Sequence, residues 1–372
     1  MRTGDLRKES DLKRGVRIFL ALTVTALLLV LVLSAGEYGW NDLLRPTTWK
    51  ELLRRDIWRD ILTNLGTAFR AVSFLYLLLS LGVISLHYYL HCLRLQLLSW
   101  ATGKFISLKT SIEFTFGGLF LGAVTPFQSG GIPLQLWVLG REGLSVGEGG
   151  AVILFRGALS LSVLVVALPF IFPYRAVLGS GAVNAVIKYL LVFYALFLFI
   201  LFSALFRTGT LRRHAFTLAD WLKRKRVARG ERLHRFLAGA FEQVTDFKRA
   251  LRDYFGKGKG RLTLSFLATL LAMALYFLLA PTLLFGIGVP DVPVTKAIVL
   301  GMIIAYLLPF VPTPGASGIA EVVSSALFFS VCPRHLLGVY VLLWRLLTFY
   351  LGVIAGAVVI LRMLRPGLGP PS

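Results

Sequence analysis

The sequence predicts an all-α polytopic membrane protein with about six full spans plus two broken, re-entrant helical hairpins arranged as inverted repeats. Three observations predict this class. The chain of 372 residues is 56% hydrophobic, with a mean hydropathy of +0.76. It contains several apolar runs of roughly 20 residues, the length that a helix needs to cross a bilayer. It also interrupts two apolar regions with proline and glycine at a density that cannot continue a helix.

The charge distribution favours a membrane protein over a nucleic-acid-binding one. The net charge is +22, which in a soluble protein would suggest nucleic acid as the partner. Here the excess positive charge lies mainly at the ends of the apolar runs, which is the positive-inside signature of membrane proteins. We therefore expect no nucleic acid partner. We expect a multi-pass protein of a bacterial-type inner (plasma) membrane, with cytoplasmic N- and C-termini.

The N-terminal part of the chain is expected to hold the first span. Residues 1–17 are polar and basic, and an apolar run follows at 18–33. This order is also typical of a signal peptide, but we favour an uncleaved span because many more spans follow. The segment 37–65 carries three tryptophans among paired acids and bases, so we expect it at the outer interface. A second span is predicted at 71–90.

One six-residue pattern occurs twice in the apolar part of the chain. The pattern Thr-Pro-x-x-Ser-Gly stands at residues 125–130 and again at 313–318. Each copy is followed at nearly the same distance by an arginine in an apolar helix, Arg156 and Arg345. The matching order indicates an internal duplication. In lipid, an interrupted backbone is tolerated only where protein buries it or a water-filled cavity solvates it, and such breaks often mark transport sites.

The duplication divides a single transmembrane domain, residues 1–372, into two repeats and a loop. We expect the first hairpin to enter from the cytoplasm and the second from the outside, which makes the repeats inverted. The boundaries are 67–206 for the first repeat, 207–261 for the loop and 262–365 for the second repeat. Further spans are expected at 149–172, 183–206, 264–285 and 336–361, and hairpin arms at 112–124, 134–139, 294–308 and 318–329.

The loop at 207–261 has a strong excess of basic residues, with 16 Lys or Arg against 5 Asp or Glu. Such a loop should be cytoplasmic. Apolar residues from Leu233 to Phe255 recur at helical spacing, so the segment is predicted to be an amphipathic helix. We expect it on the inner leaflet or packed under the bundle; recruitment of a partner is the alternative. The run 256–260 is interpreted as a hinge, because it lacks the spacing of a phosphate loop.

Three charged residues in apolar segments are not explained by the interface: Arg156, Arg345 and Glu321. Charged groups in a span cost several kcal/mol, and most of them face protein or water. In inverted repeats the two arginines would approach each other near the midplane. Helix arms that restart after the breaks would add unpaired backbone N–H groups. Two arginines and two such helix ends favour a phosphate, as in a phospholipid headgroup.

The alternative is that Arg345 and Glu321 form a buried ion pair that locks the repeats together. A transport site and an ion pair do not exclude each other. The candidate substrate-binding residues are Arg156, Arg345, Glu321, Thr125, Pro126, Ser129, Gly130, Gly131, Thr313, Pro314, Gly315, Ser317 and Gly318.

No residue set predicts catalysis, a metal or a cofactor. His87 and His91 are one helical turn apart, but they have no nearby acid, so we favour no metal site. Cys92 and Cys332 have no metal-ligand spacing, and the predicted topology places them near opposite membrane faces. We therefore expect no disulfide between them.

These residues resemble a known family, that of the flippase-like transmembrane region of lysylphosphatidylglycerol synthases. The resemblance rests on the run from Pro312 to Gly315 with Gly318 and Glu321, and on Arg345. In the first half it rests on Pro126, Gly130, Gly131 and Arg156. It covers roughly residues 15–365. The chain has Ala316 where family members often have glycine.

The resemblance implies a protein that moves lipids or lipid-linked molecules between leaflets. Bifunctional family members carry a soluble aminoacyl-transferase domain after the membrane part. Because this chain stops at Ser372, we expect a stand-alone membrane member and not an enzyme. Our leading hypothesis is a translocase for a phospholipid or lipid-linked anion, with membrane lipids as partners. The sequence has no ATP-binding motif, and it does not define the oligomeric state. The alternatives are a lipid- or glycolipid-modifying enzyme and an accessory subunit that recruits a cytoplasmic enzyme.

Overall fold

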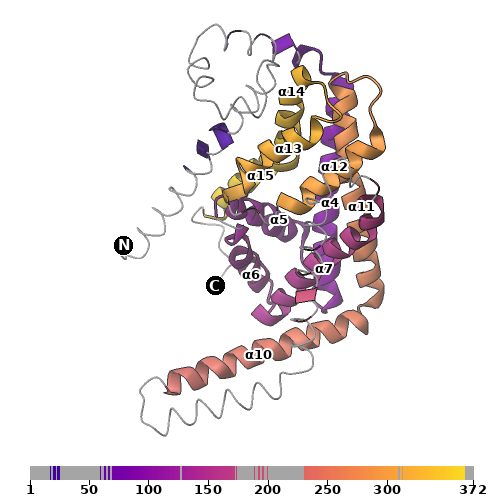
Figure 1. Cartoon of the computed structure of the whole chain (residues 1–372). Helices are drawn as coiled ribbons and strands as arrows, with labels where there is room; N and C mark the ends of the chain where they lie inside the picture. The colour runs from indigo at the N-terminus through magenta and orange to yellow at the C-terminus, as the bar shows by residue number, and fades with distance from the viewer. Residues whose placement is uncertain are drawn as a thin grey trace.

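The computed structural model describes residues 71–125, 128–171, 230–308 and 313–364, together with isolated positions elsewhere. This part of the chain consists of helices and their connections (Figure 1), which confirms the predicted all-α class, while the number of spans stays a prediction. Four of its helices are long and apolar enough to cross a membrane, and they coincide with predicted spans. They lie at residues 74–101, 146–163, 259–286 and 334–363. The spans predicted at 18–33 and 183–206 fall mostly outside the described residues.

Helices α4 (Phe74–Ala101) and α11 (Lys259–Gly286) pack along each other more extensively than any other described pair. Ala268 and Ala272 face Leu90 in this contact, and such small residues let two backbones approach closely in a membrane. The prediction ended the first of these helices at Leu90, whereas α4 continues to Ala101. Arg94 therefore lies inside the helix, where it is only 2% exposed.

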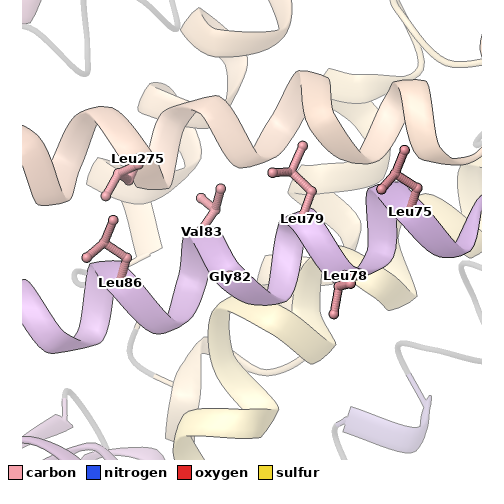
Figure 2. A pocket seen from close by; sticks show the side chains of 7 residues that line it. All are labelled: Leu75, Leu78, Leu79, Gly82, Val83, Leu86 and Leu275. Atoms are coloured by element: carbon pink, nitrogen blue, oxygen red, sulfur yellow. The ribbon is translucent and has the colours of Figure 1, made fainter.

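The lipid-facing side of this helix pair is apolar. A shallow groove of about 450 Å³ runs along it, lined by α4 and by Leu275 of α11 (Figure 2). The exposed leucines need no polar partner there, because acyl chains are as apolar as the side chains themselves. The groove residues from α4 are Leu75, Leu78, Leu79, Gly82, Val83 and Leu86.

The first hairpin consists of α5 (Leu108–Ala123) and α6 (Gly131–Arg141), which pack against each other. Ser107 begins α5, because its side chain accepts the amide hydrogen of Thr110 and caps the helix. The arms approach closely at Gly131, where an added Cβ would lie 2.9 Å from the Gly118 carbonyl oxygen. Both predicted arms are confirmed as helices, with slightly different bounds.

The second hairpin consists of α12 (Val294–Leu307) and α13 (Ile319–Phe328). A 3-10 turn, η5 (Pro314–Ala316), lies in the break between them. The backbone turns left-handed at Gly315, Ala316 and Gly318, with φ of 60°, 56° and 87°. Residues 314–317 are buried. The break is thus covered by protein, as an interrupted backbone in lipid requires.

The predicted span at 336–361 is one continuous rod with an irregular centre. It comprises α14 (Arg334–Arg345), the π turn η6 (Leu346–Tyr350) and α15 (Leu351–Met363). The amide of Leu351 donates to the Leu346 carbonyl, five residues earlier, which defines the π turn. α15 packs against α5, with Gly356 directly against the carbonyl oxygen of Phe116.

Helices α7 (Val146–Ile171) and α10 (Gly230–Phe255) pack against each other. The predicted amphipathic helix is confirmed as α10, which lies across the end of the bundle (Figure 1). Its residue Tyr254 is buried in a core with Phe155 of α7. The amide of Gly147 donates to Gln243 Oε1 at 2.8 Å and fastens α10 to the start of α7. The predicted hinge is a turn between α10 and α11.

The two halves of the described chain repeat the same order of elements. In each half a 28-residue helix is followed by a hairpin with a break and then by a long apolar segment. The duplication predicts this order. The inversion of the repeats, their boundaries and the side from which each hairpin enters stay predictions.

Candidate functional site

Glu321 and Arg345 form a buried ion pair at the second break. The Arg345 Nε atom donates to Glu321 Oε1 at 2.8 Å, and the two side chains are 2% and 0% exposed. The ion pair that the sequence offered as an alternative is therefore present. Removing two charges from water is costly, and such a pair is tolerated only if further hydrogen bonds satisfy both groups.

Two further donors satisfy the Glu321 carboxylate. The hydroxyl of Tyr350 donates to Oε1 at 3.0 Å, and the amide of Gly318 donates to Oε2 at 2.8 Å. Glu321 occupies the third position of α13, so this second bond caps the start of the helix. Tyr350 lies in the π turn. Residues five apart come to the same side of such a turn, which lets Tyr350 reach the carboxylate that Arg345 binds.

Arg345 also contacts the broken backbone directly. Its Nη2 atom donates to the Gly315 carbonyl at 3.3 Å, and its guanidinium lies 4.3 Å from the centre of the Phe349 ring. Within the break, the Thr313 hydroxyl donates to the Ser317 carbonyl at 2.9 Å. The candidate residues of the second half thus form one cluster: Thr313, Pro314, Gly315, Ser317, Gly318, Glu321 and Arg345.

The N-terminal part of the chain reaches this cluster at one described position. The Thr23 hydroxyl donates to Ser317 Oγ at 2.9 Å, and both side chains are buried. A residue far away in sequence therefore contacts the break. No sequence pattern around Thr23 predicts the contact.

Arg156 lies in a separate group of residues. Its guanidinium is 5.2 Å from the centre of the Phe114 ring, and the side chain is half-buried. The described contacts of Arg156 share no residue with those of Arg345. Joint binding of one phosphate by the two arginines therefore stays a prediction, and Arg345 already has a carboxylate partner.

The candidate residues of the first break form a tight turn. The Thr125 hydroxyl donates to the Leu121 carbonyl at 2.7 Å and accepts the Gly130 amide at 2.9 Å. Gly131 is buried against α5, whereas Ser129 is exposed. Pro126 lies outside the described residues. These residues shape the hairpin.

Sequence reasoning missed two polar residues that the structure places inside the protein. Tyr350 was overlooked because a continuous α-helix would turn it away from Arg345. The predicted span ends at Leu90 and leaves Arg94 just beyond it, yet the Arg94 Nη1 atom donates to Ser160 Oγ at 2.8 Å. The helical spacing of His87, His91 and Arg94 on one face was the available signal.

Metal ligation finds no support in the described residues, where no three His, Cys, Asp or Glu side chains gather. His87 instead has Nδ1 within 2.8 Å of the Ala272 carbonyl, and its ring packs on His91. Cys92 and Cys332 are both buried free thiols.

The fold and the site define a class of protein: an all-helical multi-pass membrane protein whose interrupted hairpin carries a buried, hydrogen-bonded ion pair. The chain belongs to the family described as Lysylphosphatidylglycerol synthase TM region, whose profile matches residues 58–356. A relative from Archaeoglobus fulgidus, described as a UPF0104 membrane protein, is 27% identical over 273 residues. These residues cover 72% of this chain and 80% of the relative. No solved structure matches the chain.

Proposed function

We propose that this protein is a translocase that moves a phospholipid or a lipid-linked anion between the leaflets of the membrane. The observation that carries the proposal is the buried pair of Glu321 and Arg345 at a helix break. Ionisable residues within spans mark substrate or ion pathways by default. Interrupted helices in the membrane are the usual setting of transport sites. Membership of a family of membrane regions named for a phospholipid synthase supports a lipid as the substrate.

The geometry suggests how an anionic headgroup would act on this pair. Glu321 caps α13, and Arg345 belongs to α14, so their bond ties the two helices together. A phosphate would offer Arg345 an alternative anionic partner. Exchange of partners would free Glu321 and loosen α13 against α14, and departure of the lipid would restore the pair. The break would thereby alternate between two arrangements in a polar cavity between the inverted repeats.

The energy source and the orientation form part of the same proposal. The sequence holds no nucleotide-binding motif, so movement would be downhill or coupled to an ion gradient. The protein would lie in a bacterial-type inner membrane with both termini in the cytoplasm, as the charge distribution predicts.

A membrane-embedded lipid-modifying enzyme is the second candidate. The observation that favours it is the family's description, which names a synthase. The two candidates differ in one measurable way: a translocase changes the leaflet of a lipid, whereas an enzyme changes its mass. Mass spectrometry of the recovered lipid therefore separates them.

The full chain would be reconstituted in liposomes that contain tail-labelled phosphatidylglycerol. The measured quantity is the rate at which label in the inner leaflet becomes accessible to an outside reagent. We expect exchange well above that of empty liposomes. The variant Arg345→Gln should lose about tenfold or more of this rate, because a neutral amide holds a phosphate far less well than a guanidinium fork does.

Arg334→Gln is the matched control, since Arg334 is exposed at the start of α14, where its guanidinium lies over the Phe329 ring. Its rate should equal that of the unchanged protein. Both variants are compared at equal amounts of folded protein, because loss of Arg345 also destabilises the fold. Exchange no faster than in empty liposomes with phosphatidylglycerol and other anionic lipids would overturn the proposal.

A further inference from the structure

A second group of cationic side chains lies between α4, α7 and α11, and its described contacts do not include the ion pair. Arg94 of α4 is its centre and is 2% exposed. Its Nη1 atom donates to Ser160 Oγ of α7 at 2.8 Å and to Thr269 Oγ1 of α11 at 3.4 Å. Its Nη2 atom lies 3.2 Å from His91 Nδ1. All these partners are neutral, so hydrogen bonds orient Arg94 without balancing its charge.

Arg156 adds a second positive charge to the same group. It is linked to Arg94 through Ser160, whose hydroxyl accepts from Arg94 Nη1 at 2.8 Å and donates to the Arg156 carbonyl at 3.2 Å. Its described contact is with the face of the Phe114 ring. Two arginines thus repel each other in a place where desolvation already makes each charge costly.

The described carboxylates near these helices are bound elsewhere. Glu113 pairs with Arg141 at 3.0 Å, and Glu148 pairs with Lys104 at 2.9 Å. Glu321 is committed to Arg345. Within the described residues, no salt bridge joins an acid to Arg94 or Arg156. The group therefore has at least one more positive charge than its described surroundings balance.

Two buried nitrogen atoms in this group lack a hydrogen-bond partner: Arg94 Nε and His91 Nε2. Arginine can only donate, so His91 Nδ1 accepts from Arg94 and the proton of a neutral His91 ring lies on Nε2. Both unpaired atoms are then donors. A buried donor without an acceptor costs roughly 1–3 kcal/mol, and an anion with several oxygens would satisfy both.

We propose that Arg94, Arg156 and His91 bind a phosphate group, with the phosphodiester of an anionic membrane lipid as its source. Phosphate offers several acceptor oxygens and full negative charge, and arginine binds it in a bidentate way. Arg156 is half-buried, unlike Arg94. The inference deepens the proposed function, because it names the headgroup chemistry and gives it a site distinct from the Glu321–Arg345 pair.

The test measures binding and not transport. The full chain in detergent would be titrated with short-chain phosphatidylglycerol, with diacylglycerol of the same chains, and with inorganic phosphate, and the Tm would be followed. Phosphatidylglycerol should raise the Tm, and diacylglycerol should not. Arg156→Gln and Arg94→Lys should each weaken phosphatidylglycerol binding by about tenfold or more, as expected for loss of one charge-assisted contact.

Arg249→Gln is the control, because Arg249 lies on α10 in an exposed pair with Asp246. It should bind phosphatidylglycerol like the unchanged protein. Arg94→Lys keeps the charge but removes Nε, so it tests the unpaired donor even if a neutral substitution at Arg94 prevents folding. Equal Tm shifts for phosphatidylglycerol and diacylglycerol, or unchanged affinity in both variants, would overturn the site.

Inorganic phosphate decides the source of the ligand. A shift that requires the lipid supports a headgroup site, and an equal shift with phosphate alone would overturn the lipid assignment in favour of soluble phosphate. Leaflet exchange measured on the same variants separates the two proposals. Variants at Arg94 or Arg156 that lose leaflet exchange but still bind phosphatidylglycerol would count against this site. If the unchanged protein binds phosphatidylglycerol but never exchanges lipid, the site stands and the proposed translocation is rejected.

Discussion

Gly356 of α15 lies directly against the carbonyl oxygen of Phe116 in α5. A side chain at position 356 cannot fit unless the two helices separate. The contact joins the last described helix of the second half to the hairpin of the first half.

Gly356→Ala should therefore destabilise the protein by about 1–3 kcal/mol, the usual cost of overpacking a close contact. Thermal unfolding in detergent measures the change as a lower Tm. Gly157→Ala in α7 is the control, because a Cβ there meets no atom within 4 Å. Alanine at that position should stabilise the helix slightly. Equal Tm values for the two variants would contradict the close approach.

Breaking the ion pair from either side should be costly. Glu321→Gln and Arg345→Met should each lower the free energy of unfolding by about 3–5 kcal/mol, because each leaves an uncompensated buried charge. The double variant should be less damaging than the sum of the two, since it leaves neither charge alone. Chemical unfolding of all four proteins gives the coupling energy. Strictly additive losses would show that the two residues do not interact.

The left-handed backbone at the break predicts two substitutions of opposite sign. Ala316→Gly should stabilise the protein by about 1 kcal/mol, because the φ of 56° strains alanine but not glycine. Gly318→Ala should destabilise it by a similar amount, since its φ is 87° although no neighbour would clash. The Tm of each variant checks the sign. A lower Tm for Ala316→Gly would indicate a different local backbone.

Cys332, in the turn before α14, should be chemically inert. Burial raises the pKa of its thiol from 9.0 to about 12. Alkylation requires the thiolate, so the folded protein should react slowly at pH 8 and still slowly at pH 10. The unfolded thiol ionises near pH 9, so this group should reduce the stability of the fold between about pH 9 and pH 12. Peptide mass spectrometry after timed iodoacetamide labelling, with and without denaturant, provides the measurement; equal rates would contradict the burial.

Much of the fold was predictable because it follows from local rules. Proline and glycine together interrupt the apolar runs at residues 125–130 and 313–318, so both hairpin breaks were located correctly. The helical spacing of apolar residues predicted α10, and the long apolar runs predicted the four described spans. The pairing of Glu321 with Arg345 was foreseen as an alternative, because a buried carboxylate needs a cation.

The remaining features depend on contacts between distant parts of the chain. Arg94 was assigned to a helix end because charge normally marks one, but Ser160 and Thr269 supply its partners from two other helices. The contact of Thr23 with Ser317 likewise produces no periodic pattern in the sequence that could have predicted it. A single arginine on a helix does not reveal whether an acid or a hydroxyl will face it, so the hydroxyl partners of Arg94 were not foreseen.

The π turn has a geometric consequence for the whole last rod. One extra residue rotates everything beyond it by about 100° relative to an uninterrupted α-helix. This rotation lets the rod direct Arg345 toward the broken hairpin of its own half and Gly352 and Gly356 toward Tyr88 and Phe116 of the other half. Deleting one residue within 346–350 would rotate Gly352 and Gly356 away from these contacts, although the composition of the rod would be almost unchanged. A single inserted residue therefore sets the orientation in which the last rod packs against both halves of the protein.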